Sequence, residues 1–398
     1  MKIAILGYGI EGKSALKFLK KKYQKAAFEV RDIKKQGKNY LENLENFDII
    51  VRSPGIPYLL SEIQKAKKAG VKITSATKLF FDNSKGKIIG ITGTKGKGTT
   101  ATLLYKILKA AGKNVYLAGN IGLPMLDILP KLKKNSITIL ELSSFQLQDM
   151  DRSPEIAIIT DISPDHLNHH KSFKEYLDAK AQIVCNPMGV VFFFPDNKYS
   201  KQIAQKSRGK KIAVSPDPNL ILKIPGFHNL KNASMAAAVG RGFGVKEDII
   251  KKAISQFKGL PHRLEFVRKV NGANYYNDSA STNPAATIAA LAAFSEPKIL
   301  IAGGAGKRLS YRPLAKAVKK SKMRAVILFG RDKYKIKKSV GAVKSIFLAN
   351  GLKSAVAMAE RKAKTGDAVI FSPAAASFDM FKNYALRGAA FKKFVRAI

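Results

Sequence analysis

Short apolar runs alternate with amphipathic helical patterns along almost all of this chain of 398 residues, and the alternation constrains its fold more than any other feature. Examples of the apolar runs are KIAIL at 2–6, KIIGIT at 87–92 and KILIAG at 298–303. Strands joined through helices can pair in parallel, because a parallel pair needs a long crossover connection. The sequence therefore predicts an α/β protein with mostly parallel sheets.

The chain is longer than one hydrophobic core normally supports, so several domains are expected. The polar segment DNSKGK at 82–87 is typical of a linker, and the alternating pattern restarts near GLPHR at 259–263. No internal repeat and no low-complexity segment is visible. We expect three α/β domains, at 1–85, 86–259 and 260–398.

The chain is strongly basic, with 71 Lys and Arg against 28 Asp and Glu and a net charge of +43. A nucleic-acid-binding module can carry such a charge, so that function stays open on charge alone. The three expected domains carry +10, +13 and +20, however, so the excess is spread along the chain and is not gathered in a binding arm. A general lysine bias explains this spread more simply, and it favours anionic small substrates.

Cysteine content and hydropathy bear on the compartment. Cys185 is the single cysteine, which excludes an internal disulfide framework and fits a reducing environment. The opening segment MKIAILGYGI is too short an apolar run for a spanning helix and lacks a cleavage site. No other stretch reaches membrane length. We expect a cytoplasmic protein without membrane insertion.

The turn GTKGKGTT at 93–100 carries the strongest chemical signal. It lies between a strand-like run and an amphipathic pattern, as phosphate-binding loops do. Its amides and Lys97 could hold the β and γ phosphates of a nucleotide, and the hydroxyl of Thr99 or Thr100 could reach Mg²⁺. Ile91 and Gly98 depart from the strict G-x-x-x-x-G-K-[ST] pattern. A nucleoside triphosphate site is predicted here.

A second glycine-rich turn, GYGIEG at 7–12, follows the first strand-like run, with Asp32 twenty residues after Gly12. This spacing matches the dinucleotide-binding fingerprint, in which glycines let the backbone approach a diphosphate at a helix N-terminus. An NAD-dependent oxidoreductase is therefore an alternative, although the match alone indicates only the diphosphate of some nucleotide.

Two further residues, Glu141 and Lys180, are candidates for metal binding. Glu141 ends the apolar run ITILE, where it could bind Mg²⁺ or cap the next turn. The helical pattern after Ser172 places Lys180 on an apolar face. A lysine there usually extends to water. If it is enclosed instead, its pKa falls, and the neutral amine can add CO2 to form a carbamate that suits Mg²⁺.

Further polar and aromatic side chains stand at the ends of strand-like runs or at helix starts. These are Asp165, His166, Asn229, Asn232, Arg263, Asp278, Thr282, Lys307, Ser377, Phe378 and Tyr384. Such positions collect ligands in open α/β sheets. The neighbouring His169 and His170 are expected to be solvated loop residues.

Eight motifs follow one another along the chain: GTKGKGTT, ELSSFQL, DHLNHH with Lys180, FHNLKNA, GLPHR, NDSASTNP, GGAGK and SPAAASFDMFKNY. In this order they resemble the Mur ligases over the whole chain. The resemblance implies a Rossmann-like N-terminal domain for a UDP sugar, a central P-loop-type ATPase domain and a Rossmann-like C-terminal domain that binds an amino acid. It also explains the turn at 7–12 without NAD.

Among Mur ligases, the motifs are most similar to those that join D-glutamate to UDP-N-acetylmuramoyl-L-alanine with ATP, through an acyl phosphate, in cytoplasmic synthesis of peptidoglycan precursors. The resemblance implies two Mg²⁺ ions and a CO2-derived carbamate on Lys180. A monomer that requires no nucleic acid is expected. Another Mur-type ligase, or a folylpolyglutamate synthetase with a different amino-acid substrate, is the alternative.

Carried over by position, the resemblance assigns Lys97, His166 and Lys180 to catalysis. The ATP site would comprise Gly93, Thr94, Lys95, Gly96, Lys97, Gly98, Thr99, Thr100, Asn229, Asn232, Arg263 and Asp278. The UDP sugar would be bound by Ile10, Glu11, Asp32, Ser53, Gly55 and Asn120. D-Glutamate would be bound by Thr282, Lys307, Ser377, Phe378 and Tyr384. The metal ions would be held by Thr99, Glu141, His166 and Lys180.

The chain departs from the family pattern at three positions. Gly98 stands where Ser or Thr is frequent, Ala280 where lysine is frequent and Tyr384 where Phe is frequent. The first two departures bear on nucleotide affinity and metal geometry, and not on the fold.

Overall fold

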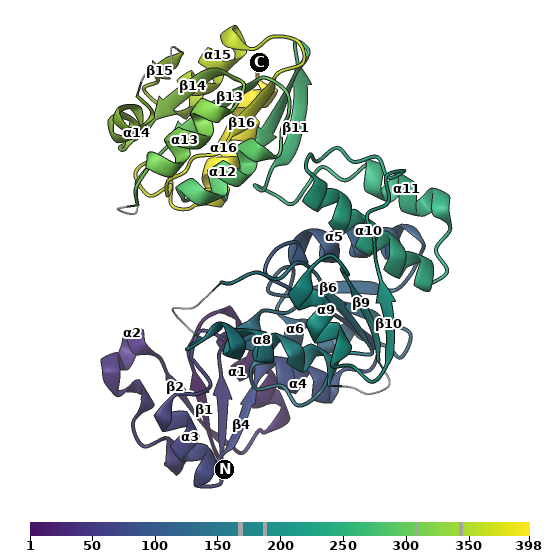
Figure 1. The fold of residues 1–398 in the computed structure, drawn as a ribbon. Coiled ribbons are helices and arrows are strands. Elements are labelled where there is room, and N and C mark those ends of the chain that lie inside the picture. Colours follow the sequence, from purple (N-terminus) through teal and green to yellow (C-terminus); the bar gives the residue numbers. More distant parts are fainter. Residues whose placement is uncertain (166–169, 186–188, 307–308, 342–344) are drawn as a thin grey trace. The chain divides into compact units, whose positions relative to one another are not determined.

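The computed structural model describes residues 1–165, 170–185, 189–306, 309–341 and 345–398. The candidate residues His166 and Lys307 lie outside these ranges. The chain divides into two compact units, Met1–Pro218 with Lys231–Ala253, and Asn219–Leu230 with Ile254–Ile398. The first unit carries two sheets and the second carries one (Figure 1).

The first sheet contains four parallel strands in the order β2-β1-β3-β4. Its strands are β1 (Lys2–Leu6), β2 (Ala27–Arg31), β3 (Ile49–Arg52) and β4 (Lys72–Ser75), and its helices are α1 (Ile10–Lys22), α2 (Ile33–Gln36), η1 (Gly37–Leu41), η2 (Leu44–Asn46), α3 (Ser61–Lys68) and α4 (Ala76–Asn83). Ile3 and Ile5 share a core with residues of α1 and α4, whereas Ala4 and Leu6 share one with α3. Both faces are therefore covered, as a continuous apolar strand predicts.

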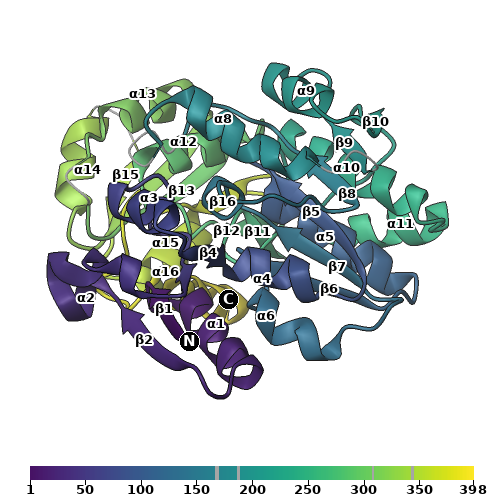
Figure 2. The ribbon, with the colours of Figure 1, turned by 90° about the horizontal axis from the view of Figure 1, so that it is seen from below.

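The second sheet contains six parallel strands in the order β10-β9-β8-β5-β7-β6. Its strands are β5 (Lys87–Thr92), β6 (Val115–Gly119), β7 (Ile137–Glu141), β8 (Ile156–Ile159), β9 (Val190–Phe193) and β10 (Lys210–Ala213). Among its helices, α5 (Lys97–Ala110) packs along β5, β6 and β7 (Figure 2). The apolar side chains Leu103, Leu104 and Ile107 of α5 are fully buried.

The remaining elements of this part of the chain complete the layers around the second sheet. They are α6 (Met125–Ile128), η3 (Leu129–Lys131), α7 (Ser144–Leu147), α8 (Phe173–Ala181), η4 (Gln182–Val184), α9 (Lys198–Gln205), α10 (Phe227–Gly242) and α11 (Glu247–Ser255). One apolar cluster runs from α1 and α4 to α6 and α8. The first two sheets thus share a continuous core, which explains why they form one compact unit.

The third sheet contains six strands in the order β11-β12-β16-β13-β14-β15. Its strands are β11 (Glu265–Val270), β12 (Ala273–Asn277), β13 (Lys298–Gly303), β14 (Met323–Phe329), β15 (Ile346–Leu348) and β16 (Ala368–Phe371), and its helices are α12 (Pro284–Ala292), α13 (Arg312–Lys320), α14 (Lys333–Val340), α15 (Leu352–Lys362) and α16 (Tyr384–Arg396). Helices α12, α13 and α14 share a core with one face, and α15 and α16 with the other.

The prediction of an α/β fold with mostly parallel sheets is confirmed. The exception is β11, which is antiparallel to β12. The two-residue connection, Asn271 and Gly272, has positive φ at both positions, 46° and 79°, as tight hairpin turns require. Each sheet falls within one predicted domain, while the exact domain limits stay a prediction. In the described part of the chain, no helix has both the length and the apolar character needed to cross a membrane.

Candidate functional site

The turn at 93–100 begins where β5 ends at Thr92, and α5 starts at Lys97. The amides of Thr94 and Lys95 donate to the carbonyl of Asp161, over 2.8 and 3.2 Å, which fixes the turn against the chain after β8. Gly96 has a φ of 88°, and a Cβ there would collide with the side-chain oxygen of Asn232. The turn therefore needs glycine for its conformation and for close approach.

The side-chain nitrogens of two lysines lie at this turn. Lys97 Nζ donates to the carbonyls of Gly93 and Thr94, over 3.0 and 3.1 Å. Lys180 Nζ, from α8, donates to the carbonyl of Gly93 over 2.8 Å and lies 4.6 Å from the centre of the Tyr176 ring. Backbone carbonyls and an aromatic face therefore hold two lysine amines at the turn.

Lys180 is enclosed. Only 2% of it is exposed, so it does not extend to water as a lysine on an apolar face usually does. Burial, with a smaller contribution from the charge of Lys97, holds its pKa well below the ordinary value, while the charges of Asp165 and Glu141 oppose this shift. The amine is therefore predisposed to lose its proton, which addition of CO2 requires.

Glu141, the last residue of β7, places a carboxylate at the end of this strand, and only 4% of its surface is exposed. Its Oε1 accepts from the Asn120 amide over 3.1 Å, whereas its Oε2 is buried without a partner in the described part of the chain. A buried carboxylate oxygen that lacks a partner suits a hard divalent cation such as Mg²⁺. The described residues contain no group of three His, Cys, Asp or Glu able to hold a metal ion, and the candidate His166 lies outside them.

His170 differs from its expectation. We expected a solvated loop residue, but His170 is 1% exposed and stacks on Phe145 with ring centres 5.4 Å apart. Its Nε2 lies 2.9 Å from Ser144 Oγ, and its Nδ1 lies 3.2 Å from Glu175 Oε1. His170 thus joins the segment after β7 to the start of α8. His169 lies outside the described residues.

The remaining candidates for nucleotide contact are buried amides and a carboxyl. In the first unit, Asn232 lies beside Gly96, with its Oδ1 3.5 Å from Thr100 Oγ1. In the second unit, Asn229 donates to the carbonyl of Pro225 over 2.6 Å. Asp278, also in the second unit, accepts from Ser372 and Leu264, and burial raises its pKa to about 6. The charge of Arg263 partly offsets that rise.

Loops at one end of the third sheet carry the predicted amino-acid site. Ser377 is buried, while Phe378 and Tyr384 are 74% and 45% exposed. Thr282 follows β12, and Lys307 lies outside the described residues. The structure adds Arg387, whose guanidinium donates to Ser279 and to the carbonyl of Ala375 and so joins the two loops. An arginine at the spacing of the apolar face of α16 was the signal for it in the sequence.

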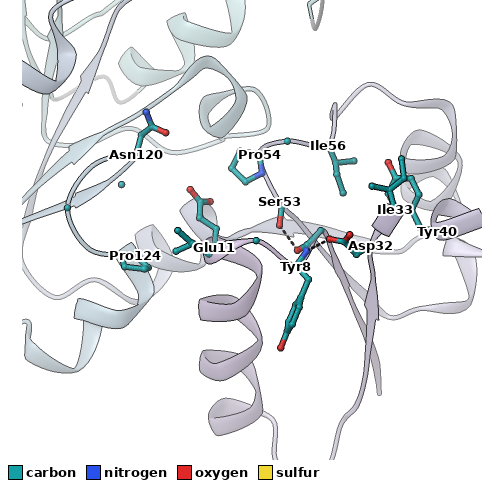
Figure 3. Close-up of a pocket in the computed structure, with 16 residues that line it drawn as sticks. Tyr8, Glu11, Asp32, Ile33, Tyr40, Ser53, Pro54, Ile56, Asn120 and Pro124 are labelled. Atoms are coloured by element: carbon teal, nitrogen blue, oxygen red, sulfur yellow. Dashed lines mark hydrogen bonds between the residues drawn. The ribbon is translucent and has the colours of Figure 1, made fainter. Parts of the chain in front are cut away.

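A cavity of about 610 Å³ opens at the turn 7–12 (Figure 3). Its wall comes from the strand ends of the first sheet and from the loop that follows β6. Asp32 accepts from the Tyr8 amide over 2.7 Å, and Ser53 donates to the carbonyl of Gly7 over 2.8 Å. All six residues predicted for the UDP sugar line it: Ile10, Glu11, Asp32, Ser53, Gly55 and Asn120. Their binding role stays a prediction.

The sequence is similar to known protein families and to named relatives. A model of the Mur ligase middle domain matches residues 91–221, and a model of the Mur ligase glutamate ligase domain matches residues 262–375. A UDP-N-acetylmuramoylalanine–D-glutamate ligase of Acetivibrio thermocellus is 37% identical over 454 residues, which cover 100% of this chain and 96% of that protein. The ligase of the same name from Clostridium botulinum strain 657 is 36% identical, with 100% and 97% covered.

Solved structures share the fold at lower identity. The UDP-N-acetylmuramate–alanine ligase MurC of Thermotoga maritima has a TM-score of 0.59 at 18% identity, with 100% of this chain and 99% of that one covered. A bifunctional folylpolyglutamate synthase/dihydrofolate synthase of Yersinia pestis has a TM-score of 0.56 at 18% identity, with 79% and 91% covered. At such identity they show the fold alone.

The sheets define an α/β protein, and the turn at 93–100 has the strand–turn–helix form of a P-loop. The relatives that are 36% and 37% identical over the full length of the chain identify its family. The chain belongs to the Mur ligase family.

Proposed function

We propose that this chain is an ATP-dependent ligase that adds D-glutamate to UDP-N-acetylmuramoyl-L-alanine in the cytoplasmic synthesis of peptidoglycan precursors. The observation that carries the proposal is the enclosure of Lys180 behind the turn at 93–96, with Lys97 and Glu141 close by. The names of the full-length relatives support the choice of substrates.

The chemistry needs an activated carboxyl, because a carboxylate is a poor electrophile. In the first step, the alanine carboxylate oxygen attacks the γ phosphorus of ATP, and the bond to the β-γ bridging oxygen breaks, which releases ADP. In the second, the D-glutamate amine attacks the acyl phosphate carbon, phosphate leaves and the amine proton is lost. Lys97 would place its ammonium on the transferred phosphoryl oxygens, where negative charge gathers.

The proposed reaction also assigns residues to two Mg²⁺ ions. Thr99 and Glu141 would hold one Mg²⁺, and His166 with a carbamate on Lys180 would hold a second. When bound, such ions neutralise the crowded oxygens of phosphoryl transfer. The buried and unpartnered Oε2 of Glu141 and the enclosed amine of Lys180 fit these roles.

The other ligands would occupy the sites predicted from the sequence. The UDP sugar would fill the cavity at the turn 7–12, and Asn229, Asn232, Arg263 and Asp278 would contact the nucleotide. Thr282, Lys307, Ser377, Phe378 and Tyr384 would receive D-glutamate, with Lys307 paired to a carboxylate.

The test is release of ADP and phosphate from ATP in the presence of UDP-N-acetylmuramoyl-L-alanine, with and without D-glutamate. We expect sustained turnover only when both are present. A panel of amino acids at equal concentration should show D-glutamate as the preferred substrate. Activity only with a diamino acid, or with a folate in place of the UDP sugar, would refute the proposed substrates.

A further inference from the structure

Glu11 places a carboxyl group in the wall of the cavity at the turn 7–12. It is the second residue of α1, and its side chain extends toward the side of the cavity that Asn120 and Pro54 line (Figure 3). Gln146 donates to its Oε1 over 2.7 Å. Its Oε2 is buried and has no hydrogen-bond partner in the part of the chain that the structure describes.

The Arg52 guanidinium does not neutralise this carboxyl fully. The Arg52 guanidinium acts on Glu11, but it pairs with Asp149 over 2.8 Å and also donates to the carbonyls of Ile56 and Phe145. Both side chains of that ion pair are almost completely buried. The net charge of the group formed by Arg52, Asp149 and Glu11 is −1 when Glu11 is ionised. It is zero when Glu11 is protonated.

Several other charged groups near the cavity have contacts of their own. Asp32 accepts from two backbone amides, and Asp127 accepts from Ser14 over 2.6 Å. The ammonium groups of Lys13 and Lys35 lie 5.5 and 5.3 Å from the centre of the Tyr8 ring. Tyr40, which also lines the cavity, has its pKa raised by burial and stays neutral at physiological pH.

A UDP sugar brings two negative charges on its diphosphate. The glycine-rich turn and the N-terminus of α1 suit such an anion, but an ionised carboxylate in the same wall repels it. A protonated carboxyl removes the repulsion and offers a donor to an acceptor-rich ligand. Burial raises the pKa of Glu11 above its ordinary value, and Gln146 and Arg52 offset only part of the rise.

We propose that Glu11 is protonated in the substrate complex, so that binding of the diphosphate ligand takes up one proton from solvent at this carboxyl. This inference rests on the proposed function, because it takes the UDP sugar as the ligand of the cavity. Glu11 would thus set the pH range in which the enzyme holds its substrate, a role that lies outside the phosphoryl-transfer chemistry.

The direction of the pH effect follows from linkage. The anionic ligand favours the protonated form, so the pKa of Glu11 is higher in the complex than in the free protein. Between these two pKa values the association constant falls as pH rises, by up to about tenfold per pH unit, and it is flat below the lower value. Replacement of Glu11 by glutamine removes the titration and keeps a donor in the cavity.

The experiment is titration calorimetry with UDP-N-acetylmuramoyl-L-alanine, without ATP, from pH 5 to pH 9. Buffers that differ in ionisation enthalpy report the protons taken up. We expect uptake that approaches one proton per bound ligand in the wild type at some pH in this range. Glu11→Gln should bind with no linked uptake and with an affinity independent of pH.

The matched control is Glu62→Gln, which changes an exposed glutamate at the second position of α3. It should retain the proton uptake of the wild type. No uptake in the wild type at any pH tested, or equal uptake in Glu11→Gln, would overturn the inference. Failure of the wild type to bind the UDP sugar at every pH would overturn the proposed function and the inference with it.

Discussion

The two glycine-rich turns of the first unit are built alike and differ in charge. Each follows a strand inside its sheet and leads into a helix, and each contains a glycine with positive φ, Gly7 at 82° and Gly96 at 88°. The turn at 93–100 holds the ammonium group of Lys97 and the enclosed amine of Lys180, whereas the turn at 7–12 has the carboxyl of Glu11. The backbone of both turns has the form that suits phosphate, and under the proposed function the side chains decide whether phosphate is transferred or only bound.

The largest expected effect comes from Lys97→Met. Loss of the ammonium removes stabilisation of the transferred phosphoryl group, and we expect turnover to fall by about 10³-fold or more. Affinity for the UDP sugar should stay within about twofold, because that ligand is proposed to bind at the other turn. Phosphate release and calorimetry measure the two effects. Lys109→Met, at an exposed position of the same helix, is the control and should keep its activity. If Lys97→Met weakened the affinity for the UDP sugar as strongly as it lowered turnover, the two turns would not act separately, and the comparison would fail.

Lys180→Ala should lower turnover by about 10² to 10³-fold. Acetate added to this variant should restore part of the activity, because it can supply a carboxylate in place of the carbamate. Phosphate release with and without acetate measures the rescue. Activity like that of the wild type would refute the metal-holding role of Lys180.

Lys180 also predicts a pH dependence of stability. Its pKa in the folded protein lies below that of the unfolded chain, so the unfolded chain binds the proton more readily and the free energy of unfolding rises with pH between the two values. Lys180→Met lacks this titration. In buffer free of CO2, it should melt at a higher temperature than the wild type at pH 7, and the difference should shrink as pH rises. If the difference in melting temperature between Lys180→Met and the wild type did not change with pH, the titration of Lys180 would not contribute to stability.

Within the turn at 7–12, Gly12 and Gly9 should respond differently to alanine. A Cβ at Gly12 would collide with the carbonyl oxygen of Gly7, whereas a Cβ at Gly9 meets no atom within 4 Å. We expect Gly12→Ala to lower the free energy of unfolding by about 2 to 3 kcal/mol. Gly9→Ala should stay within about 0.5 kcal/mol of the wild type and should weaken UDP-sugar binding, because the methyl group enters the cavity. Chemical denaturation measures the stability of the two variants, and calorimetry measures their affinity for the UDP sugar. Equal destabilisation by the two substitutions would show that the turn tolerates a side chain neither at Gly9 nor at Gly12.

The smallest effect concerns Lys231, a positioning residue that the sequence analysis missed. Its ammonium pairs with Asp161 over 2.7 Å and with Asp196 over 2.9 Å, and the carbonyl of Asp161 holds the turn at 93–96. Lys231→Met leaves two carboxylates facing each other, and we expect the KM for ATP to rise about tenfold with a smaller change in kcat.

Two variants serve as controls for that prediction. Lys231→Arg should restore most of the ATP affinity, because it keeps the charge. Lys174→Met removes an exposed pair with Asp178 and should change neither constant. A loss of stability without any change in the KM for ATP would show that Lys231 only holds the fold.

Much of the fold and part of the site followed from local sequence patterns. The strand–turn–helix alternation predicted the parallel sheets because apolar runs of strand length with helical connections leave few other arrangements. Both glycine-rich turns were located between a strand and a helix because that arrangement is encoded within a few consecutive positions. Arg387 and Lys231 were missed because their partners, Ser279 for Arg387 and Asp161 and Asp196 for Lys231, lie far away in the chain, so the local pattern around each lysine or arginine does not reveal its role.

By itself, the sequence determined the α/β class, the order of the motifs and the family, because these depend on residue types at short spacing. Only the tertiary structure decided that Lys180 is enclosed, that His170 is buried and that Glu11 shares a single guanidinium with Asp149. Lys180 donates to a carbonyl 87 positions away, and Gln146 reaches Glu11 across 135. The charge state of a buried group depends on desolvation and on neighbours that meet only when the chain folds.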